Sequence, residues 1–426
     1  MTKPAPRGVS RRQFIARSGT AVASAGLVPS LSAGVHIGGD EVIKVGLIGC
    51  GGRGTGAARQ ALKADASARL VAMGDAFIDR LEPSLNSIKN SDVGPQVMVD
   101  EEHKFTGFEA YKGVIDSVDV VLLCATPHFR PRHLRAAIEA GKHVFCEKPV
   151  AVDAPGVRHV METCRMAKEK NLNVVSGLCY RYQDAKREVI QKVHEGAVGD
   201  IISLQCTYNT GFLWHRGRQP EWSEMEYQLR NWLYWTWLSG DHIAEQSIHS
   251  LDKILWAMKD VPPAKVTASG GRIVRTDPKF GNIFDHFNTV FEWESGPKLF
   301  HSCRQWGGAD ADVSDYVFGT KGTAALQSHY VTGENEWRFR GRPSDMYQQE
   351  HDEFFAAMRN GTPINNGDYM CKSTLMAIMG RMSAYTGKTI TWEQALNSQL
   401  DLTPAEYAWG DIETRPVAQP GVTPFI

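Results

Sequence analysis

Three glycines and an aspartate near the start of the chain have the types and spacing of a dinucleotide site. Gly49, Gly51 and Gly54 fit the pattern G-x-G-x-x-G, and Asp75 follows 26 positions after Gly49. In this pattern the first glycine makes a tight turn, the second lets the backbone approach a pyrophosphate, and the third lets a helix pack closely on a strand. An acid at this distance can bind both ribose hydroxyls. The alternative is a glycine-rich turn that merely connects a strand to a helix.

Regular elements that could position these residues flank the turn. An apolar run at 45–48 leads into the glycines, a small-residue stretch at 55–64 is typical of a helix, and a second apolar run at 70–73 ends before the acid. This order of strand, turn, helix, strand and acid predicts a nicotinamide dinucleotide whose phosphates face the helix N-terminus. We therefore add Gly52 and Arg53, at the start of that helix, to the expected cofactor contacts.

The acid after the second apolar run bears on the choice between NAD and NADP. Asp75 favours NAD, because a carboxylate repels a 2′-phosphate. Arg80 lies close enough in sequence to complicate this choice, and it is counted among the expected cofactor contacts. The cofactor is therefore predicted to be NAD, with NADP left open.

Composition limits the class of protein. The chain has 426 residues, enough for two domains, with 42% apolar and 22% charged residues, which is typical of a globular protein. The net charge of −1 gives no indication of a general nucleic-acid binder. No run of 18 or more apolar residues follows the N-terminus, so no membrane span is expected once a signal has been removed.

The N-terminus reads as a targeting segment rather than as part of a fold. Arg11 and Arg12 are followed by Phe-Ile and by a mildly apolar stretch at 21–31, which resembles a twin-arginine export signal. With a plausible cleavage region at 30–33, the predicted signal covers residues 1–33, and a disordered basic tail is the alternative. Because this pathway exports folded proteins, we expect a periplasmic or otherwise exported protein that binds its dinucleotide tightly before export.

The eight cysteines fit a chain that folds in the cytoplasm. None forms a C-x-x-C pair, and several lie in apolar, strand-like runs. Free thiols of this kind behave as small buried hydrophobes. We predict no structural disulfide and no zinc cluster.

The pattern of strand-like and helical runs along the chain changes near residue 183. Strand-like and helical runs alternate over 42–182, which predicts an α/β class with a doubly wound parallel sheet, the Rossmann domain. Strands with short turns dominate 183–400, which predicts a second domain with an open, mainly antiparallel sheet for substrate binding and oligomerisation. Within it, a helix in 372–395 could pack back on the first domain. Residues 401–426 are assigned as a tail.

Three motifs resemble the Gfo/Idh/MocA oxidoreductases, which include glucose–fructose oxidoreductase and inositol dehydrogenase. They are the Gly-Leu-Ile-Gly-x-Gly-x-x-Gly of 46–54, the stretch around Glu-Lys-Pro at 140–150, and Glu-x3-His-x2-Asp at 245–252. The resemblance covers about 42–400. It implies a Rossmann domain with a C-terminal α/β domain, and hydride transfer between NAD(P) and a sugar or polyol. It also implies homodimers or homotetramers formed through the open sheet, and an exported twin-arginine subset exists.

The resemblance assigns roles to residues that follow the strands of the first domain. Lys148 stands at the edge where parallel sheets bind ligands, and it is expected to bind the reacting hydroxyl and help move its proton. The alternative is a surface lysine in a turn. Glu147 is expected to orient Lys148 or to contact the cofactor, and Thr126-Pro127 resembles the family's turn beside the nicotinamide ribose.

A second group of candidates lies in the other domain. Glu245 and His249 are four residues apart, so on one helix they share a face. The family usually has Asp and His there, and it implies His249 as an acid/base with Glu245 beside it. A helix-capping or core histidine is the alternative. His242 adds a third potential ligand, but the resemblance explains Glu245 and His249 without metal, so no metal is expected and His242 is assigned to the substrate.

Two further features leave more than one interpretation. Arg181 and Tyr180 follow the last strand of the first domain and are expected near the substrate, but Arg181 could instead form an interdomain salt bridge. The aromatic-rich block at 212–237 could stack on sugar rings, form a subunit contact or pack in the core.

These observations predict an oxidoreductase acting on a secondary hydroxyl of a sugar, polyol or glycoside. The first alternative is an NAD-dependent glycosidase or lyase that acts through transient oxidation. Pro131 stands where the best-known glycosidase branch has a histidine, which counts against that branch. A binding or scaffold protein with a relict Rossmann domain is the second alternative, and the intact glycines, Asp75, Lys148 and His249 argue against it.

Overall fold

The computed structural model describes residues 41–426. The predicted export signal of residues 1–33 lies outside the described residues and stays a prediction. None of the helices within 41–426 combines the length and the apolar character that a membrane span requires.

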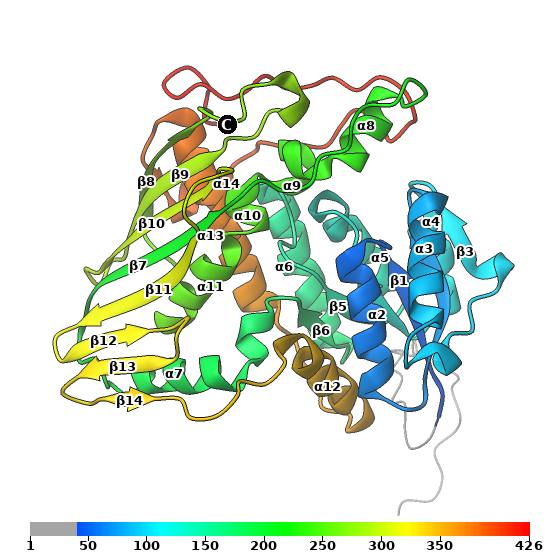
Figure 1. Ribbon diagram of the computed structural model, residues 1–426, viewed down its shortest axis with the longest axis horizontal. Coiled ribbons are helices and arrows are strands. Elements are labelled where there is room, and N and C mark those ends of the chain that lie inside the picture. The colour runs from blue at the N-terminus through cyan, green and yellow to red at the C-terminus, as the bar shows by residue number, and fades with distance from the viewer. Residues whose placement is uncertain (1–40) are drawn as a thin grey trace, which may run out of the picture. The chain divides into compact units, whose positions relative to one another are not determined.

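Six parallel strands form the first sheet, in the order β3-β2-β1-β4-β5-β6, which confirms the predicted Rossmann arrangement (Figure 1). The strand order reverses beside β1, so a crevice opens between the carboxyl ends of β1 and β4. Buried Val, Ile and Leu fill β1 and β4, as expected for strands covered on both faces. The strands are β1 (Ile43–Ile48), β2 (Ala68–Asp75), β3 (Lys104–Thr106), β4 (Val120–Leu123), β5 (His143–Cys146) and β6 (Val174–Ser176).

Helices cover both faces of this sheet. One apolar cluster joins α2 and α3 to one face, together with α12 from much later in the chain, and a second cluster joins α4, α5 and α6 to the other. The helices are α2 (Gly52–Ala64), α3 (Ile78–Lys89), α4 (Ala110–Ser117), α5 (Arg130–Glu139), α6 (Ala154–Glu169) and α12 (Met346–Arg359). Short 3-10 turns lie at η1 (Gly94–Gln96), η2 (Glu101–His103), η3 (Pro127–Phe129) and η4 (Cys179–Tyr182).

The second sheet has nine strands, in the order β14-β13-β12-β11-β7-β10-β9-β8-β15. It is mainly antiparallel, as predicted, but β7 and β10 are parallel neighbours. This pair is parallel because the chain leaves β7 through a long helical connection before it returns to the sheet. The strands are β7 (Ile201–Thr210), β8 (Lys265–Gly271), β9 (His286–Glu292), β10 (Lys298–Gln305), β11 (Asp312–Gly319), β12 (Gly322–Ala325), β13 (Tyr330–Gly333), β14 (Trp337–Arg338) and β15 (Ile390–Thr391).

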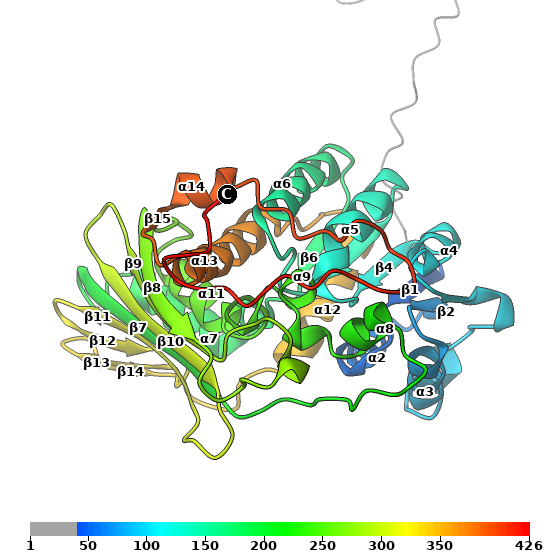
Figure 2. The same ribbon diagram turned by 90° about the horizontal axis from the view of Figure 1, so that it is seen from above.

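Helices pack on one face of the second sheet and leave the other face open (Figures 1 and 2). The alternation along β10 shows this, because Leu299, His301 and Cys303 are buried while Phe300 is exposed. The helices of this domain are α7 (Asp184–His194), α8 (Glu224–Arg230), α9 (Thr236–Ser239), α10 (His242–Glu245), α11 (Ile248–Ala257), α13 (Gly367–Thr386) and α14 (Trp392–Asn397), with 3-10 turns η5 (Trp232–Tyr234) and η6 (Pro278–Phe280).

Helix α13 joins the two domains. It packs against both α6 of the first domain and β8 of the second, and nearly all of its residues are buried. The helix ends at Thr386 because Gly387 takes a left-handed conformation, with φ of 72°. The expected helical stretch of 372–395 is therefore two helices, α13 and α14, with β15 between them. Beyond α14 the tail runs back over α5 (Figure 2), where the Tyr407 hydroxyl meets His128 Nε2 at 2.8 Å.

Arg181 is a second tie between the domains. Its guanidinium binds Asp252 of α11, with Nη2 2.8 Å from Oδ1, and Asp260, with Nη2 2.6 Å from Oδ1. The rings of Tyr369 and Trp256 lie 3.9 and 5.2 Å from the guanidinium carbon. The substrate-binding role expected for Arg181 is therefore wrong, because Asp252 and Asp260 already accept hydrogen bonds from all three guanidinium nitrogens. The structure supports the interdomain salt bridge instead.

Several histidines are buried in the fold without charge. His133 of α5 stacks on Tyr111 at 4.3 Å between ring centroids, and neither ring nitrogen has a hydrogen-bond partner within residues 41–426. Burial lowers the pKa of His133 to about 3, and it lowers the pKa of His301 to about 3 and that of His128 to about 4. Below the unfolded pKa of about 6.5, the unfolded chain therefore takes up protons that the folded chain does not.

Replacing Arg181 should destabilise the fold without affecting the cleft. Arg181→Leu leaves Asp252 buried and unpaired, so the free energy of unfolding should fall by about 3–5 kcal/mol. Arg165→Leu, which removes an exposed partner of Glu169, should change it by less than about 0.5 kcal/mol. Urea denaturation measures both effects. A dinucleotide affinity lowered in folded Arg181→Leu protein would contradict this assignment.

Replacing His133 should reduce the decrease in the free energy of unfolding that occurs between pH 7 and pH 5. Since the unfolded state binds the extra proton, stability falls as pH drops from 6.5 towards 3, and this residue should cost roughly 2 kcal/mol at pH 5 relative to pH 7. His133→Phe should remove that part of the pH dependence, whereas His103→Phe, at the surface, should keep it. Urea midpoints at pH 7 and pH 5 test the difference. An unchanged pH dependence in His133→Phe would show that His133 is not neutral in the fold.

Candidate functional site

A cleft of about 540 Å³ opens at the reversal of strand order in the first sheet and continues to the second domain. Most of the residues expected from the sequence line it, including groups from both domains. They are Gly49, Gly51, Gly52, Arg53, Gly54, Asp75, Arg80, Thr126, Glu147, Lys148, Glu245 and His249. Pro127, Tyr180, Arg181 and His242 do not line it.

The glycine turn has the close approaches that its spacing predicts. Gly49 has a φ of 96°, and a Cβ there would lie 2.3 Å from the backbone nitrogen of Ala125. A Cβ on Gly54 would lie 1.9 Å from the Gly49 oxygen, whereas Cβ atoms on Gly51 and Gly52 would enter open space. The turn is therefore tight against the sheet and open towards the cleft. This backbone cradle at the start of α2 fits the pyrophosphate of a dinucleotide.

Asp75 ends β2 at the opposite side of the turn. Its carboxylate accepts hydrogen bonds from the backbone N–H of Cys50 at 2.7 Å and of Phe77 at 3.0 Å. Burial raises the pKa of this carboxyl group. Thr126, after β4, adds a buried hydroxyl that has no hydrogen-bond partner within residues 41–426. The Asp75 carboxylate and the Thr126 hydroxyl are each suited to bind a ribose hydroxyl of a dinucleotide.

Arg53 lines the cleft, but its guanidinium is held by two buried carboxylates. The Nε atom donates to Glu147 Oε1, and Nη2 donates to Glu350 Oε1 at 2.6 Å. The ring of Tyr347 covers the guanidinium carbon at 4.8 Å. Burial would raise the pKa of Glu147, but the charges of Arg53 and Lys148 lower it instead, while burial raises the pKa of Glu350. Arg53 therefore joins the glycine turn to the strand that carries Lys148.

Glu350 and Tyr347 were not expected from the sequence. Both lie on α12, nearly 300 residues after the glycine turn, and no motif marks them. Helix α12 brings Tyr347 to the cleft and Glu350 to Arg53, because its apolar residues, such as Phe354 and Phe355, pack on the same face of the sheet as α2.

Lys148 and Glu245 meet across the two domains. The Lys148 ammonium donates to the backbone oxygen of Glu245 at 2.5 Å and lies 3.5 Å from Glu245 Oε1. Lys148 follows β5, and the peptide bond to Pro149 is cis. The second carboxylate oxygen of Glu245 is buried without a hydrogen-bond partner within residues 41–426. A basic and an acidic group are thus fixed side by side at the inner end of the cleft.

His249 completes this group, but not on the single helix that the spacing predicted. Glu245 ends α10 and His249 lies in α11, with a break at 246–247 between the two helices. Tyr180 packs edge-to-face on the imidazole, with ring centroids 5.3 Å apart. Burial and the nearby Lys148 charge lower the pKa of His249 well below its usual value, and Nδ1 has no hydrogen-bond partner within residues 41–426. His249 is therefore a neutral imidazole at the cleft wall.

Two expected contacts lie elsewhere. His242 is buried in the second domain, where Nδ1 lies 2.9 Å from Asp241 Oδ1 and the ring packs against Phe287. Its substrate-binding role is therefore wrong, because the break after α10 leaves His242 in the core. Pro127 is buried in η3 behind Thr126 and does not reach the cleft.

Within residues 41–426, no group of three or more His, Cys, Asp and Glu side chains could hold a metal ion. All eight cysteines belong to this described part, where they are free thiols, and only Cys124 is not fully buried.

The aromatic-rich block divides between the core and the cleft. Tyr227, Tyr234, Trp235 and Trp237 pack in an apolar cluster. The rings of Trp214 and Trp232 line the cleft near Asp75, together with Arg216 and Arg230. The sequence held no signal for these basic residues, because contact with the first domain depends on how the segment between β7 and α10 folds back over α3.

Comparison with known proteins agrees with this architecture. A family model described as an oxidoreductase family with an NAD-binding Rossmann fold matches residues 43–178, and a GFO/IDH/MocA C-terminal domain model matches residues 187–325. Inositol 2-dehydrogenase 3 of Saccharopolyspora erythraea is 29% identical over 297 residues, which are 68% of this chain and 75% of that protein.

A second curated relative and a solved structure extend the comparison. The 2,7-anhydro-N-acetylneuraminate hydratase of Escherichia coli is 29% identical over 222 residues, which are 51% of this chain and 53% of the hydratase. The structure of myo-inositol 2-dehydrogenase from Lactobacillus plantarum superposes with a TM-score of 0.64 at 20% identity, over 82% of this chain and 99% of that one. From its two matched domains and the cleft between them, this chain belongs to the Gfo/Idh/MocA family of oxidoreductases with an NAD-binding Rossmann fold.

Proposed function

We propose that the protein transfers hydride between a nicotinamide dinucleotide and a secondary hydroxyl of a polyol or sugar. The observation that carries this proposal is the meeting of Lys148, Glu245 and His249 in the same cleft as the glycine turn. The inositol 2-dehydrogenase relative supports a polyol-like substrate. When bound, the dinucleotide supplies the hydride acceptor or donor.

Residues of the chain bind the substrate hydroxyl, stabilise the alkoxide and accept the proton. The Lys148 ammonium has three hydrogens, and Glu245 engages it through its backbone oxygen and its carboxylate, so a further hydrogen can bind the substrate hydroxyl. The positive charge stabilises an alkoxide as it forms. His249 is neutral, so it can take the hydroxyl proton, while Glu147 and Arg53 hold the strand end that carries Lys148.

We also infer that the dinucleotide is held tightly. Segments outside the Rossmann domain pack on residues that line the cleft near Asp75. Trp409 of the tail lies 4.6 Å from the Phe108 ring and 5.4 Å from the Phe77 ring, measured between centroids. Arg230 of α8 binds Asp79 of α3 through two contacts of 2.9 Å. Release of a bound dinucleotide would require these contacts to open, which supports slow exchange.

A second candidate is cleavage or elimination assisted by transient oxidation, which the hydratase relative favours. The two candidates differ in their net chemistry. Net reduction of the nicotinamide by a polyol, without loss of any leaving group, indicates the oxidoreductase. Release of a leaving group with no net reduction indicates the alternative.

Removing Lys148 should abolish turnover in either case and leave the dinucleotide in place. We expect Lys148→Ala to lower kcat by about 100- to 1,000-fold, because the group that binds the hydroxyl and stabilises the alkoxide is lost. Lys142→Ala, before β5 and outside the cleft, should retain activity. Absorbance of the nicotinamide measures turnover, and mass spectrometry of the purified variants detects the retained dinucleotide. Activity surviving in Lys148→Ala would refute the assignment of this site.

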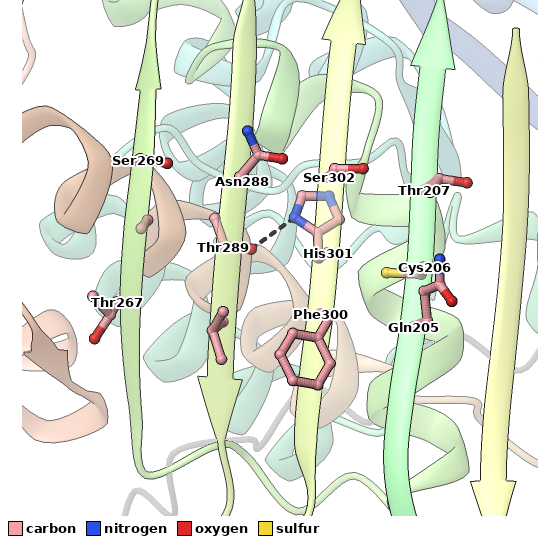
Figure 3. Close-up of a pocket in the computed structure, with 12 residues that line it drawn as sticks. Gln205, Cys206, Thr207, Thr267, Ser269, Asn288, Thr289, Phe300, His301 and Ser302 are labelled. Atoms are coloured by element: carbon pink, nitrogen blue, oxygen red, sulfur yellow. Dashed lines mark hydrogen bonds between the residues drawn. The ribbon is translucent and has the colours of Figure 1, made fainter.

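We further propose that the open face of the second sheet is an interface between copies of this chain. A groove of about 510 Å³ crosses four strands on this face, and Figure 3 shows Ser269, Asn288, Ser302 and Thr207 in a row across it. Its lining contains no Lys, Arg, Asp or Glu, and Phe300 is 53% exposed within it. Depletion of charge around an exposed aromatic residue is typical of the core of a protein interface.

A charge placed in this groove should weaken association. Phe300→Glu should shift a dimer or tetramer towards smaller species, because a carboxylate would be buried without a partner. Met98→Glu, at an equally exposed position on the first domain, should leave the oligomer unchanged. Light scattering over a range of concentrations measures both variants. A wild-type protein that is monomeric at all concentrations would exclude the interface.

A further inference from the structure

Arg130 is a buried cation at the cleft wall without a carboxylate partner. It begins α5 and lines the cleft, although it is only 5% exposed. Its guanidinium makes a single hydrogen bond within residues 41–426, in which Nη1 donates to the backbone oxygen of Pro149 at 2.5 Å. Nε is buried without a partner in the same part of the chain. Arginine is almost never this buried unless its charge is paired, so the missing anion requires an explanation.

The acids near Arg130 have other partners. Glu147 accepts a hydrogen bond from Arg53 through Oε1 and the Lys148 backbone N–H through Oε2. Glu245 lies against Lys148 through Oε1, and its Oε2 has no hydrogen-bond partner within residues 41–426, so it is not bonded to Arg130. Burial lowers the pKa of Arg130, although the charges of Glu147 and Glu245 act to raise it. The acids of the chain therefore leave the desolvation of Arg130 uncompensated.

Contact with the cleft distinguishes Arg130 from two other buried arginines, Arg275 and Arg381. Neither of these forms an ion pair within the described part of the chain. The Tyr234 ring centroid lies 5.6 Å from the Arg275 guanidinium carbon, and neither residue lines the cleft. The Tyr385 ring centroid lies 6.0 Å from the Arg381 guanidinium carbon, again away from the cleft. Arg275 and Arg381 are therefore part of the core, whereas Arg130 is placed where a ligand can supply the missing charge.

The nitrogens of Arg130 show how a ligand would approach. Nη1 is bonded to Pro149 and Nε is enclosed by protein, but Nη2 is neither bonded nor enclosed in the described structure. Nη2 therefore presents the positive charge to the cleft. The hydrogen bond to Pro149 also fixes the guanidinium beside the residue that follows Lys148, so the cation lies close to the group that binds the reacting hydroxyl.

We propose that Arg130 binds a carboxylate of the substrate, so that the polyol or sugar oxidised in this cleft is an acid of the uronate or aldonate class. This inference rests on the proposed function, and it makes Arg130 a specificity-determining residue. A guanidinium is suited to this role, because its hydrogen bonds to a carboxylate are charge-assisted and about twice as strong as neutral ones. The carboxylate fixes the substrate at one end while Lys148 binds the hydroxyl, and it takes no part in hydride transfer.

Matched pairs of neutral compounds and their acids test the proposal. The pairs are glucose and glucuronate, galactose and galacturonate, and sorbitol and gluconate, in which a hydroxymethyl group is replaced by a carboxylate. Absorbance of the nicotinamide gives kcat/KM for each compound with NAD, and calorimetry gives its affinity. Wild-type protein should favour the acid by about tenfold or more in at least one pair, since a hydrogen bond to a charged group contributes roughly this factor.

Variants of Arg130 assign the preference to its guanidinium. Arg130→Gln should lower the ratio of kcat/KM for the acid to that for the neutral compound by about tenfold to a hundredfold, because the charge is lost while a donor for the Pro149 oxygen remains. Arg130→Lys should restore part of the ratio, because it keeps the charge without the fork. Arg132→Gln, which removes a partner of Glu109 outside the cleft lining, should keep the wild-type ratio. Calorimetry with NAD shows whether each variant retains a folded cofactor site.

The outcomes distinguish this inference from the proposed function. Wild-type protein that binds no acid more tightly than its neutral counterpart would overturn the inference alone. A preference for the acid that survives in Arg130→Gln would also overturn it, as would a loss of NAD affinity at an unchanged ratio, because that result would place the guanidinium on the cofactor. Tighter binding of the acids without net reduction of the nicotinamide would instead contradict the proposed hydride transfer and retain the carboxylate site.

Discussion

The contact between the Lys148 ammonium and Glu245 is the constraint on which the site depends. Lys148 ends a strand of the first sheet, and Glu245 ends a helix of the second domain. In the function proposed for this cleft, neither domain alone contains a complete acid–base group. The packing of the two domains then contributes to the proposed chemistry, and α13 and the Arg181 ion pairs stabilise the arrangement in which the contact exists.

Buried charges around the cleft are paired with opposite charges from other elements. Arg53 lies between Glu147 and Glu350, and Lys253 is paired with Asp315 where both side chains are fully buried. The attraction within a buried pair offsets the cost of desolvation only in good geometry. Small rotations between the elements that carry these groups are consequently disfavoured.

The cleft is completed by segments that are remote in the chain. The part that contains Lys148 is built from the strand ends of the first sheet and from α10 and α11, which lie within the two matched family domains. Residues near 214–232 line the other part of the cleft, and Trp409 of the tail packs on Phe108, which also lines the cleft. The motifs therefore mark the glycine turn, Asp75 and the group around Lys148, whereas Trp214, Arg216 and Trp232 reach the cleft without a motif.

The sequence by itself determined the two-domain α/β architecture, the glycine cradle, Asp75 and the Lys148 position. Each of these depends on local patterns: strand periodicity, turn glycines, and a residue at the carboxyl end of a strand. Tertiary structure decided the partners of the charged side chains. Arg181 and His242 carry types suited to a site, yet packing places one between two aspartates and the other in a core. Glu350 and Arg216 carry no motif, yet α12 brings Glu350 to Arg53, and the segment between β7 and α8 brings Arg216 to the cleft. Spacing along the chain sets which backbone elements form. The interaction partners of a side chain depend instead on contacts between elements that are far apart in sequence, and no local pattern encodes these contacts.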